Sequence, residues 1–287
     1  MKLAKQARQR LKGQWRGAMA AEWMLVTAGL VLLLLEVLSL RLSGIGIETV
    51  LHFDELVVNP GMLPHALIIV GIVLLDILVT SPLRAGQAAY YYRTADPART
   101  EYVSSGILRC CYTRGSYGRA VRWRLILWWY RLLWGSVCTL PAAMLLGYGQ
   151  LLFQRGGDDP VANIQILFCG FFGLFALLAG FVTMQLILLR YMPAQYFLAE
   201  EKTVRGALRR GKQLMKGRVG EAAWMAAGFS GWLLTCLLLV PYFYVAPLYR
   251  TSRALWVRRK EAERLREVQT ELGRTRAVDM PPALPAG

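Results

Sequence analysis

The sequence has few charged side chains, and among them few acidic ones. Asp, Glu, Lys and Arg make up 18% of its 287 residues, whereas a typical soluble domain has about 25%. Only 18 residues are acidic against 34 Lys and Arg, which gives a net charge of +16. This balance excludes an ordinary soluble enzyme and an acidic disordered chain. A nucleic-acid-binding protein and a multi-pass membrane protein remain.

Residue types that carry most enzyme chemistry are scarce as well. The chain has two histidines, and its five cysteines form no C-x-x-C motif. Walker A, G-x-S-x-G and H-E-x-x-H motifs are absent from the sequence. His52, Asp54 and Glu55 match no defined metal-ligand spacing, and Cys110 and Cys111 are adjacent in a basic segment where thiols stay reduced. We therefore predict no catalytic residue, no metal site and no cofactor.

Long hydrophobic runs, by contrast, are abundant. Apolar residues make up 55% of the chain, and the mean hydropathy is +0.36. Because about 20 mostly apolar residues cross about 30 Å of hydrocarbon, four runs are long enough to span a bilayer: 18–40, 63–83, 126–152 and 161–189. A fifth run, 222–248, contains two prolines. The sequence therefore predicts an all-α, polytopic membrane helical bundle of five to six hydrophobic segments.

The basic residues alternate between the loops. Segments 1–17, 84–125 and 190–221 carry six, eight and eight Lys and Arg, whereas 41–62 and 153–160 carry one each. Lys and Arg in short loops mark the cytoplasmic side, so we expect a membrane protein with its N-terminus inside. The first run is too long for a signal peptide and lacks a cleavage site, which predicts an uncleaved span. The positive charge is therefore an orientation signal, and nucleic acid is not an expected partner.

The fifth run leaves two topologies open. Residues 250–287 carry nine Lys and Arg, so their charge favours the cytoplasmic side, but a single crossing by 222–248 would place them outside. Either the run forms a hairpin or re-entrant pair hinged near Pro241, or it crosses once against the charge rule. We favour an inside tail.

Two segments outside the runs have the pattern of basic amphipathic helices. Residues 3–16 and 203–216 place apolar side chains at helical spacing, with Lys and Arg on the other face. Thr203 suits the start of the second helix and Gly217 suits its end. Such helices lie in the anionic inner leaflet, which makes anionic inner-leaflet lipids the expected partners. A disordered basic tail is an alternative for the first segment.

The last part of the chain predicts a charged helix over 253–272, with Arg259 and Glu263 four residues apart. The chain thus divides into three parts. These are a basic amphipathic N-terminal segment (1–17), an integral membrane domain (18–257) and a charged cytoplasmic tail (258–287).

Ionisable residues inside the predicted spans provide the sharpest hypotheses about a site. A charged side chain near mid-membrane costs about 2.5–3.5 kcal/mol, so each should have a partner. By depth, Asp76, Arg131 and Gln185 could form one polar cluster in the cytoplasmic half. Glu36 and His65 could form a pair near the outer surface. The Asp76 cluster would be either a structural ion pair or the lining of a path for a polar substrate or protons.

Short motifs resemble a bacterial multi-pass membrane family known as domain of unknown function 975. The sequence L-M-K-G, which includes Leu214, Met215 and Gly217, is followed by Gly231-Trp232 and Pro241-Tyr242. The resemblance extends over nearly the whole chain. The family has a longer stretch between its G-W and P-Y motifs than the eight residues found here. The resemblance implies a membrane fold and a location in a bacterial plasma membrane. Because the family has no established activity, it implies little about function.

The leading functional hypothesis is a non-enzymatic membrane protein. It would serve as a transport or envelope accessory or as a scaffold associated with anionic lipid, with other membrane proteins as further partners. One alternative is a small transporter for a polar or lipid substrate, with Asp76, Arg131 and Gln185 near its path. A membrane enzyme is disfavoured because the sequence has no nucleophile–base or metal-ligand set.

Overall fold

The computed structural model is helical throughout the part of the chain that it describes. The described residues are 2–42, 63–98, 102–113, 115–155, 160–235 and 239–278. Four helices are long and apolar enough to cross a membrane: α2 (Trp15–Leu42), α5 (Leu63–Thr94), α6 (Ser116–Arg155) and α7 (Pro160–Leu189). They coincide with the four long hydrophobic runs. The prediction of an all-α protein with membrane-length helices is therefore confirmed for these residues.

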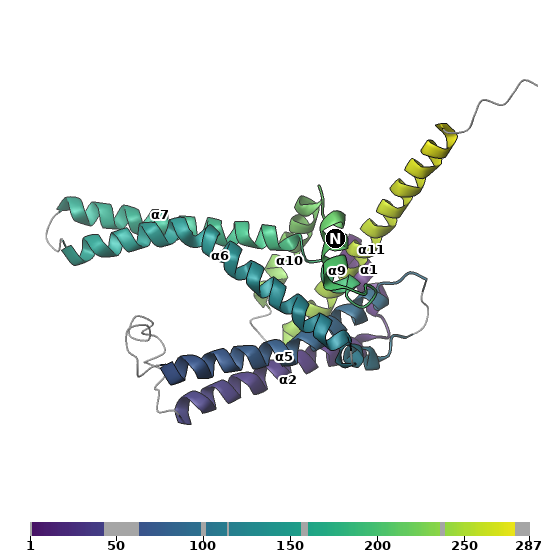
Figure 1. The fold of residues 1–287 in the computed structure, drawn as a ribbon, viewed down its shortest axis with the longest axis horizontal. Helices are drawn as coiled ribbons and strands as arrows, with labels where there is room; N and C mark the ends of the chain where they lie inside the picture. The colour runs from purple at the N-terminus through teal and green to yellow at the C-terminus, as the bar shows by residue number, and fades with distance from the viewer. Residues whose placement is uncertain are drawn as a thin grey trace, which may run out of the picture.

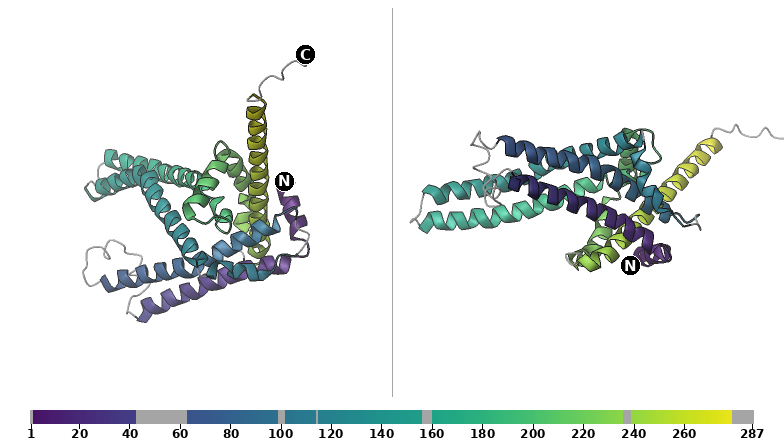
Figure 2. Two further views of the ribbon diagram at one scale, coloured as in Figure 1. Left: turned by 45° about the vertical axis from the view of Figure 1, so that its right-hand side comes forward. Right: turned by 90° about the horizontal axis from the view of Figure 1, so that it is seen from below.

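The four long helices form two antiparallel hairpins, α2–α5 and α6–α7, which diverge from a shared end (Figure 1). Shorter helices gather at that end: α1 (Lys2–Leu11), η2 (Ser105–Tyr112), α8 (Ala194–Phe197) and α9 (Val204–Leu214) (Figure 2). We call these short helices, with the last turns of α5 and the central part of α11 (Leu239–Val278), the head. The basic segments that were predicted to share one side of the membrane thus lie together in the structure.

The fifth hydrophobic run is divided between two helices, α10 (Val219–Thr235) and α11. They are antiparallel, because Lys260 lies 2.9 Å from Glu221 while the rings of Tyr249 and Phe229 lie 5.2 Å apart. Pro241 falls in the first turn of α11, where a helix does not need the missing N–H. This antiparallel pairing is compatible with the hairpin alternative, which stays a prediction.

The helix α11 continues without interruption through the predicted boundary at residue 258. The predicted charged helix over 253–272 is its second half, and the predicted ion pair between Arg259 and Glu263 is present at 3.1 Å. At 1.5 Å per residue, its 40 residues extend about 60 Å. The tail and the membrane domain therefore share one helix over 239–278.

The core of the head surrounds the last turns of α5. The consecutive side chains of Tyr90, Tyr91 and Tyr92 are all buried, although successive residues point in different directions around a helix. The helix must therefore be covered on several sides at this level. Leu11 from α1 and Phe197 from α8 belong to the same cluster of buried residues.

The two predicted amphipathic helices are present, but protein covers their apolar faces. On α1, Ala7 and Leu11 are buried, and the helix packs against α11. On α9, Val204, Ala207 and Leu214 are buried in the head. The expectation that these faces lie in the lipid was therefore wrong. An apolar stripe shows that a face needs cover, but it does not distinguish lipid from protein as the covering material.

The ends of α9 agree with the prediction. The side chain of Thr203 accepts a hydrogen bond from the backbone N–H of Gly206 at 3.1 Å, as an N-cap residue does. Gly217 has a φ of +73° after the helix, a conformation that favours glycine.

A proline inside α5 creates the junction between α5 and α6. Pro82 has no N–H to donate to the carbonyl of Leu78 four residues earlier. The hydroxyl of Tyr117, in the first turn of α6, donates to this carbonyl at 3.2 Å, and the hydroxyl of Tyr112 donates to the carbonyl of Val79 at 2.9 Å. The start of α6 is thereby fixed at the level of Leu78 and Val79.

Away from the head, the long helices expose large apolar side chains. Phe171 and Phe175 on α7, for example, are 68% and 67% exposed. Only 11% of the most apolar stretch of α6 is buried, and the same fraction applies to α7. An apolar surface of this extent requires an apolar surrounding or a partner. The structure thus supports a membrane protein.

The contact between α6 and α7 depends on a glycine. A Cβ atom at Gly180 would lie 2.2 Å from the carbonyl oxygen of Cys138, so the two backbones touch at this point. Gly170, on the same helix, has open space at the corresponding position. We expect Gly180→Ala to lower the free energy of unfolding by about 1–3 kcal/mol because the helices must separate. Reversible unfolding in mixed micelles measures this change.

Gly170→Ala is the matched control, since it adds the same methyl group without a contact. Equal stability of the two variants would contradict the close approach of α6 and α7.

Candidate functional site

A fully buried carboxylate lies where α2, α5 and α11 meet. Glu22 on α2 has no exposed surface. The hydroxyl of Tyr91 donates a hydrogen bond to its Oε1 atom at 2.8 Å, and the hydroxyl of Tyr242 donates to Oε2 at 3.2 Å. The Nε atom of Arg250 lies 3.2 Å from Oε1. We call these four residues the Glu22 cluster.

The surroundings of the Glu22 cluster join α2 to α5 through further polar contacts. The Nε2 atom of Gln87 donates to the carbonyl of Ala21 at 3.2 Å, and the hydroxyl of Tyr90 donates to the carbonyl of Gln14 at 3.4 Å. A buried carboxylate is stable only when it is paired and hydrogen-bonded. The partners of Glu22 meet that requirement, so the cluster acts as a polar clamp on three helices.

A second polar network lies in the head and joins α9 to α11. Arg210 on α9 forms ion pairs with Glu200 at 3.2 Å, with Glu201 at 3.3 Å and with Glu261 on α11. Burial alone would lower the pKa of Arg210, but the hydrogen bond to Glu261 and the neighbouring carboxylates raise it above its ordinary value. Arg210 therefore stays charged, and its guanidinium also lies 4.2 Å from the ring centroid of Phe197.

Two residues extend this network to α5. The hydroxyl of Tyr92 donates to Glu261 at 2.6 Å. Arg258 stacks on the Tyr92 ring at 4.0 Å and forms an ion pair with Asp96 at 3.2 Å. The end of α5 is thereby attached to α11.

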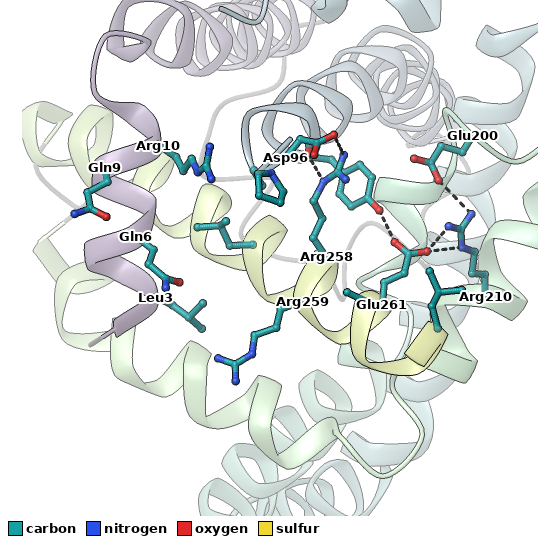
Figure 3. A pocket seen from close by; sticks show the side chains of 16 residues that line it. Leu3, Gln6, Gln9, Arg10, Asp96, Glu200, Arg210, Arg258, Arg259 and Glu261 are labelled. Carbon is teal, nitrogen blue, oxygen red and sulfur yellow. Dashed lines mark hydrogen bonds and ion pairs between the residues drawn. The ribbon is translucent and has the colours of Figure 1, made fainter. Parts of the chain in front are cut away.

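The second network forms one wall of an open pocket of about 680 Å³. Side chains of α1 lie on the opposite side: Leu3, Gln6, Gln9 and Arg10 (Figure 3). The pocket's acidic residues, Asp96, Glu200 and Glu261, are each engaged by an arginine. Because their charges are already balanced, the pocket offers hydrogen-bonding groups and apolar surface, and Arg10 is a lining cation without an ion pair among the described residues. Among those residues, no group of three His, Cys, Asp or Glu side chains is arranged to hold a metal ion.

The contacts predicted for Asp76, Arg131 and Gln185 are absent from the ion pairs and hydrogen bonds of the described residues. No ion pair within 4 Å joins Asp76 to Arg131, and the exposed side chain of Gln185 forms no hydrogen bond with either of them. Instead, Asp76 and Arg131 both lie within electrostatic range of Arg84 and Arg124. Depth along a span predicted their shared neighbourhood, but it could not predict the direction of each side chain.

The predicted outer pair remains a prediction. Glu36 is partly buried on α2, whereas the side chain of His65 lies outside the described residues. His52, Asp54 and Glu55 also lie outside them.

The residues of the family motif fall in different environments. Leu214 and Met215 are buried in the head, and Gly217 follows them. Gly231 and Trp232 are exposed on α10, and Trp232 is 60% exposed. Pro241 begins the turn that presents Tyr242 to Glu22. Of the motif residues, Tyr242 thus contributes directly to the Glu22 cluster.

Sequence reasoning missed Glu22 itself. The residue lies near the start of the first hydrophobic run, where one carboxylate hardly lowers the average hydropathy of a long window. The available signal was a carboxylate inside a predicted span together with an arginine, Arg250, at the end of the fifth run.

The adjacent thiols of η2 border a smaller pocket of about 110 Å³, which Arg93, Ser116 and Arg119 also line. The sulfur atoms of Cys110 and Cys111 lie 3.6 Å apart. The hydrogen bond from Cys111 lowers the pKa of Cys110 to about 7, with burial opposing this shift and Arg93 assisting it. The same hydrogen bond and burial raise the pKa of Cys111. Cys110 is therefore the more reactive thiol.

We expect Glu22→Gln to leave the charge of Arg250 without its partner. Removing one partner of a fully buried pair costs about 3–5 kcal/mol. Arg250 is 29% exposed, so we expect a smaller loss of about 2–3 kcal/mol in the free energy of unfolding. Chemical unfolding of the purified protein measures it. Glu221→Gln, which affects a carboxylate that is 54% exposed, should cost less than about 1 kcal/mol.

The double variant Glu22→Gln, Arg250→Gln separates the interaction from the two single losses. It should be more stable than the sum of the single effects implies. Strict additivity would show that Glu22 and Arg250 do not interact.

The alkylation rate of Cys110 by iodoacetamide should depend on pH with a midpoint near 7, because only the thiolate reacts. Lowering the pH from about 7 to about 6 should reduce the rate about fivefold as the thiolate is protonated. Mass spectrometry of the modified peptide measures the rate. Cys111→Ala removes the hydrogen-bond donor, and we expect it to shift the midpoint toward 9.0. A midpoint near that ordinary value in the unaltered protein would rule out the activated thiol.

Comparison with known proteins does not extend this description. The chain has no significant match among protein-family models, curated proteins or solved structures. The resemblance to domain of unknown function 975 stays a prediction, and the geometry of the head and its two polar networks is the basis for any functional conclusion.

Proposed function

We propose that this chain is a non-enzymatic, multi-pass protein of the bacterial plasma membrane, related to domain of unknown function 975. Its head would lie on the cytoplasmic side, with the N-terminus inside, and would act as a scaffold or accessory that associates with anionic lipids. One observation carries the proposal: the head separates its charges into paired acids and unpaired cations.

The acidic residues of the head and its adjoining helices are occupied by internal partners. Eight carboxylates each lie within 4 Å of an Arg or Lys side chain: Glu22, Asp96, Glu200, Glu201, Glu221, Glu261, Glu263 and Glu267. Each pair satisfies a cation that belongs to the fold. These acids therefore cancel little of the charge that the head presents to its surroundings.

Many of the basic residues, in contrast, are exposed and unpaired. The following side chains form no ion pair and no hydrogen bond with another described residue: Lys5, Arg8, Lys12, Arg16, Arg109, Arg122, Lys202, Arg205, Arg209, Lys212 and Lys216. Near an anionic membrane surface, each Lys or Arg contributes about 1 kcal/mol of attraction. A head with this surface would be held against anionic lipid headgroups.

The small-transporter alternative has weaker support. It needs a polar path between the helices, and among the described residues no ion pair or hydrogen bond joins the three residues proposed to line that path. The pocket in Figure 3 lies in the head, between α1, the end of α5, α9 and the polar part of α11, and not between the apolar stretches of the long helices.

The lipids that co-purify with the full chain in polymer-bounded membrane discs test the proposal. Phosphatidylglycerol should be enriched over phosphatidylcholine, as measured by mass spectrometry of the extracted lipids. Replacing Lys5, Arg8, Lys12 and Arg16 together with Gln should reduce this enrichment about tenfold or more. Raising the salt concentration to about 1 M should also reduce it, because the Debye length falls to about 3 Å.

Arg41→Gln, at the opposite end of α2, is the control and should leave the enrichment unchanged. The proposal fails if phosphatidylglycerol is not enriched, or if the fourfold variant and the Arg41 variant behave alike.

A further inference from the structure

Three arginines converge at the junction of α5 and α6. Arg84 lies on α5, and Arg124 and Arg131 lie two turns apart on α6. Arg84 is within electrostatic range of Arg131 and Asp76, and Arg124 is within range of Arg84, Arg131 and Asp76. Like charges thus lie within electrostatic range of one another on two packed helices.

The described residues do not balance these charges. Arg250, which also lies within range of Arg84, is paired with Glu22. None of the three arginines forms an ion pair within 4 Å with a described residue, and Asp76 is the one acidic residue among the electrostatic neighbours of Arg84 and Arg124. Three positive charges therefore face one negative charge.

Two of the guanidinium groups also have an unused donor. The Nε atoms of Arg84 and Arg124 are buried and have no hydrogen-bond partner. Arg84 is the residue that remains partly exposed within the otherwise buried stretch 80–92 of α5. A buried donor without a partner costs about 1–3 kcal/mol, and more when the group is charged. An anion at this position would satisfy the donors and reduce the repulsion between the arginines.

The position suits a phospholipid phosphate. Tyr112 and Tyr117 mark the level where α6 meets α5, and tyrosine is enriched at the membrane–water interface. Arg131 lies further along α6 and is exposed on its surface, so it can be approached from the bilayer, while Arg84 and Arg124 are partly exposed beside it. Guanidinium groups bind phosphate through paired hydrogen bonds.

We propose that Arg84, Arg124 and Arg131 bind the phosphate group of an anionic phospholipid at the α5–α6 junction, and that Asp76 weakens this binding by repulsion. The inference rests on the proposed membrane location of the head. It names one specific site, whereas the exposed cations of the head attract lipid without a defined geometry.

Native mass spectrometry of the delipidated full chain, titrated with phosphatidylglycerol in detergent, tests the site. Arg84→Gln with Arg124→Gln should lower the affinity for the first bound lipid about tenfold or more, since charged hydrogen bonds are lost. Arg264→Gln with Arg266→Gln removes the same charge from the projecting part of α11 and should leave this affinity unchanged. Equal affinities of the two double variants would overturn the proposal.

Asp76→Asn provides a test in the opposite direction. It removes the one negative charge near the arginines, so phosphatidylglycerol should bind several-fold more tightly. A purely structural role for Asp76 would instead weaken binding through loss of stability. Unchanged or weaker binding in a variant that remains folded by circular dichroism would therefore overturn the proposal.

Competition with inorganic phosphate tests whether the site binds a lipid phosphate or the free ion. Millimolar phosphate should not displace phosphatidylglycerol, because the free ion lacks the acyl chains that hold the lipid at the junction. Displacement by phosphate would overturn the assignment to a lipid.

The test of the arginine site can fail or succeed independently of the test of the proposed function. If the Arg84 and Arg124 variant loses the tightly bound lipid while lipid enrichment around the head is unchanged, the result supports the specific site. If that variant binds the lipid normally while the fourfold variant of residues 5–16 loses the enrichment, the specific site is overturned and the proposed function is still supported.

Discussion

The fold depends on the neutralisation of one buried carboxylate. Glu22 has no contact with the surroundings of the protein, so its charge must be met by the helices around it. Tyr91 supplies a hydroxyl from α5, while Tyr242 and Arg250 supply a hydroxyl and a cation from α11. The charge can be satisfied only when α2, α5 and α11 are in register. The contacts of Glu22 therefore fix the start of α11 against α2 and α5.

The pairing of buried acids with cations also explains why the surface of the head is positively charged. Acids that lie between helices are consumed by internal pairs, as in the network of Arg210, Glu261 and Tyr92. The cations left over are distributed on the outside or gathered at the α5–α6 junction. The basic residues that the structure describes are therefore divided by the fold into a group paired with acids inside the protein and an unpaired group on its surface.

Much of the fold was predictable because a bilayer imposes a length on each span. The four long runs correspond to α2, α5, α6 and α7, and the cap at Thr203 and the turn at Gly217 follow from local rules. The packing of the head was not predictable in this way. The apolar faces of α1 and α9 could be recognised in the sequence. The same pattern of apolar residues, however, is expected whether lipid or protein buries the face. Glu22 was hidden by its apolar neighbours, and the grouping of Asp76 with Arg84 and Arg124 depends on rotations around α5 and α6 that depth alone does not specify.

The unbroken course of α11 has a mechanical consequence. The helix carries Tyr242 and Arg250 at one end, and it projects beyond the head at the other (Figure 1). Because one helix contains both parts, a displacement of the segment near Leu265 would be passed along α11 toward the hydroxyl and guanidinium groups that hold Glu22. The projecting end is thus continuous with the interior of the helical bundle.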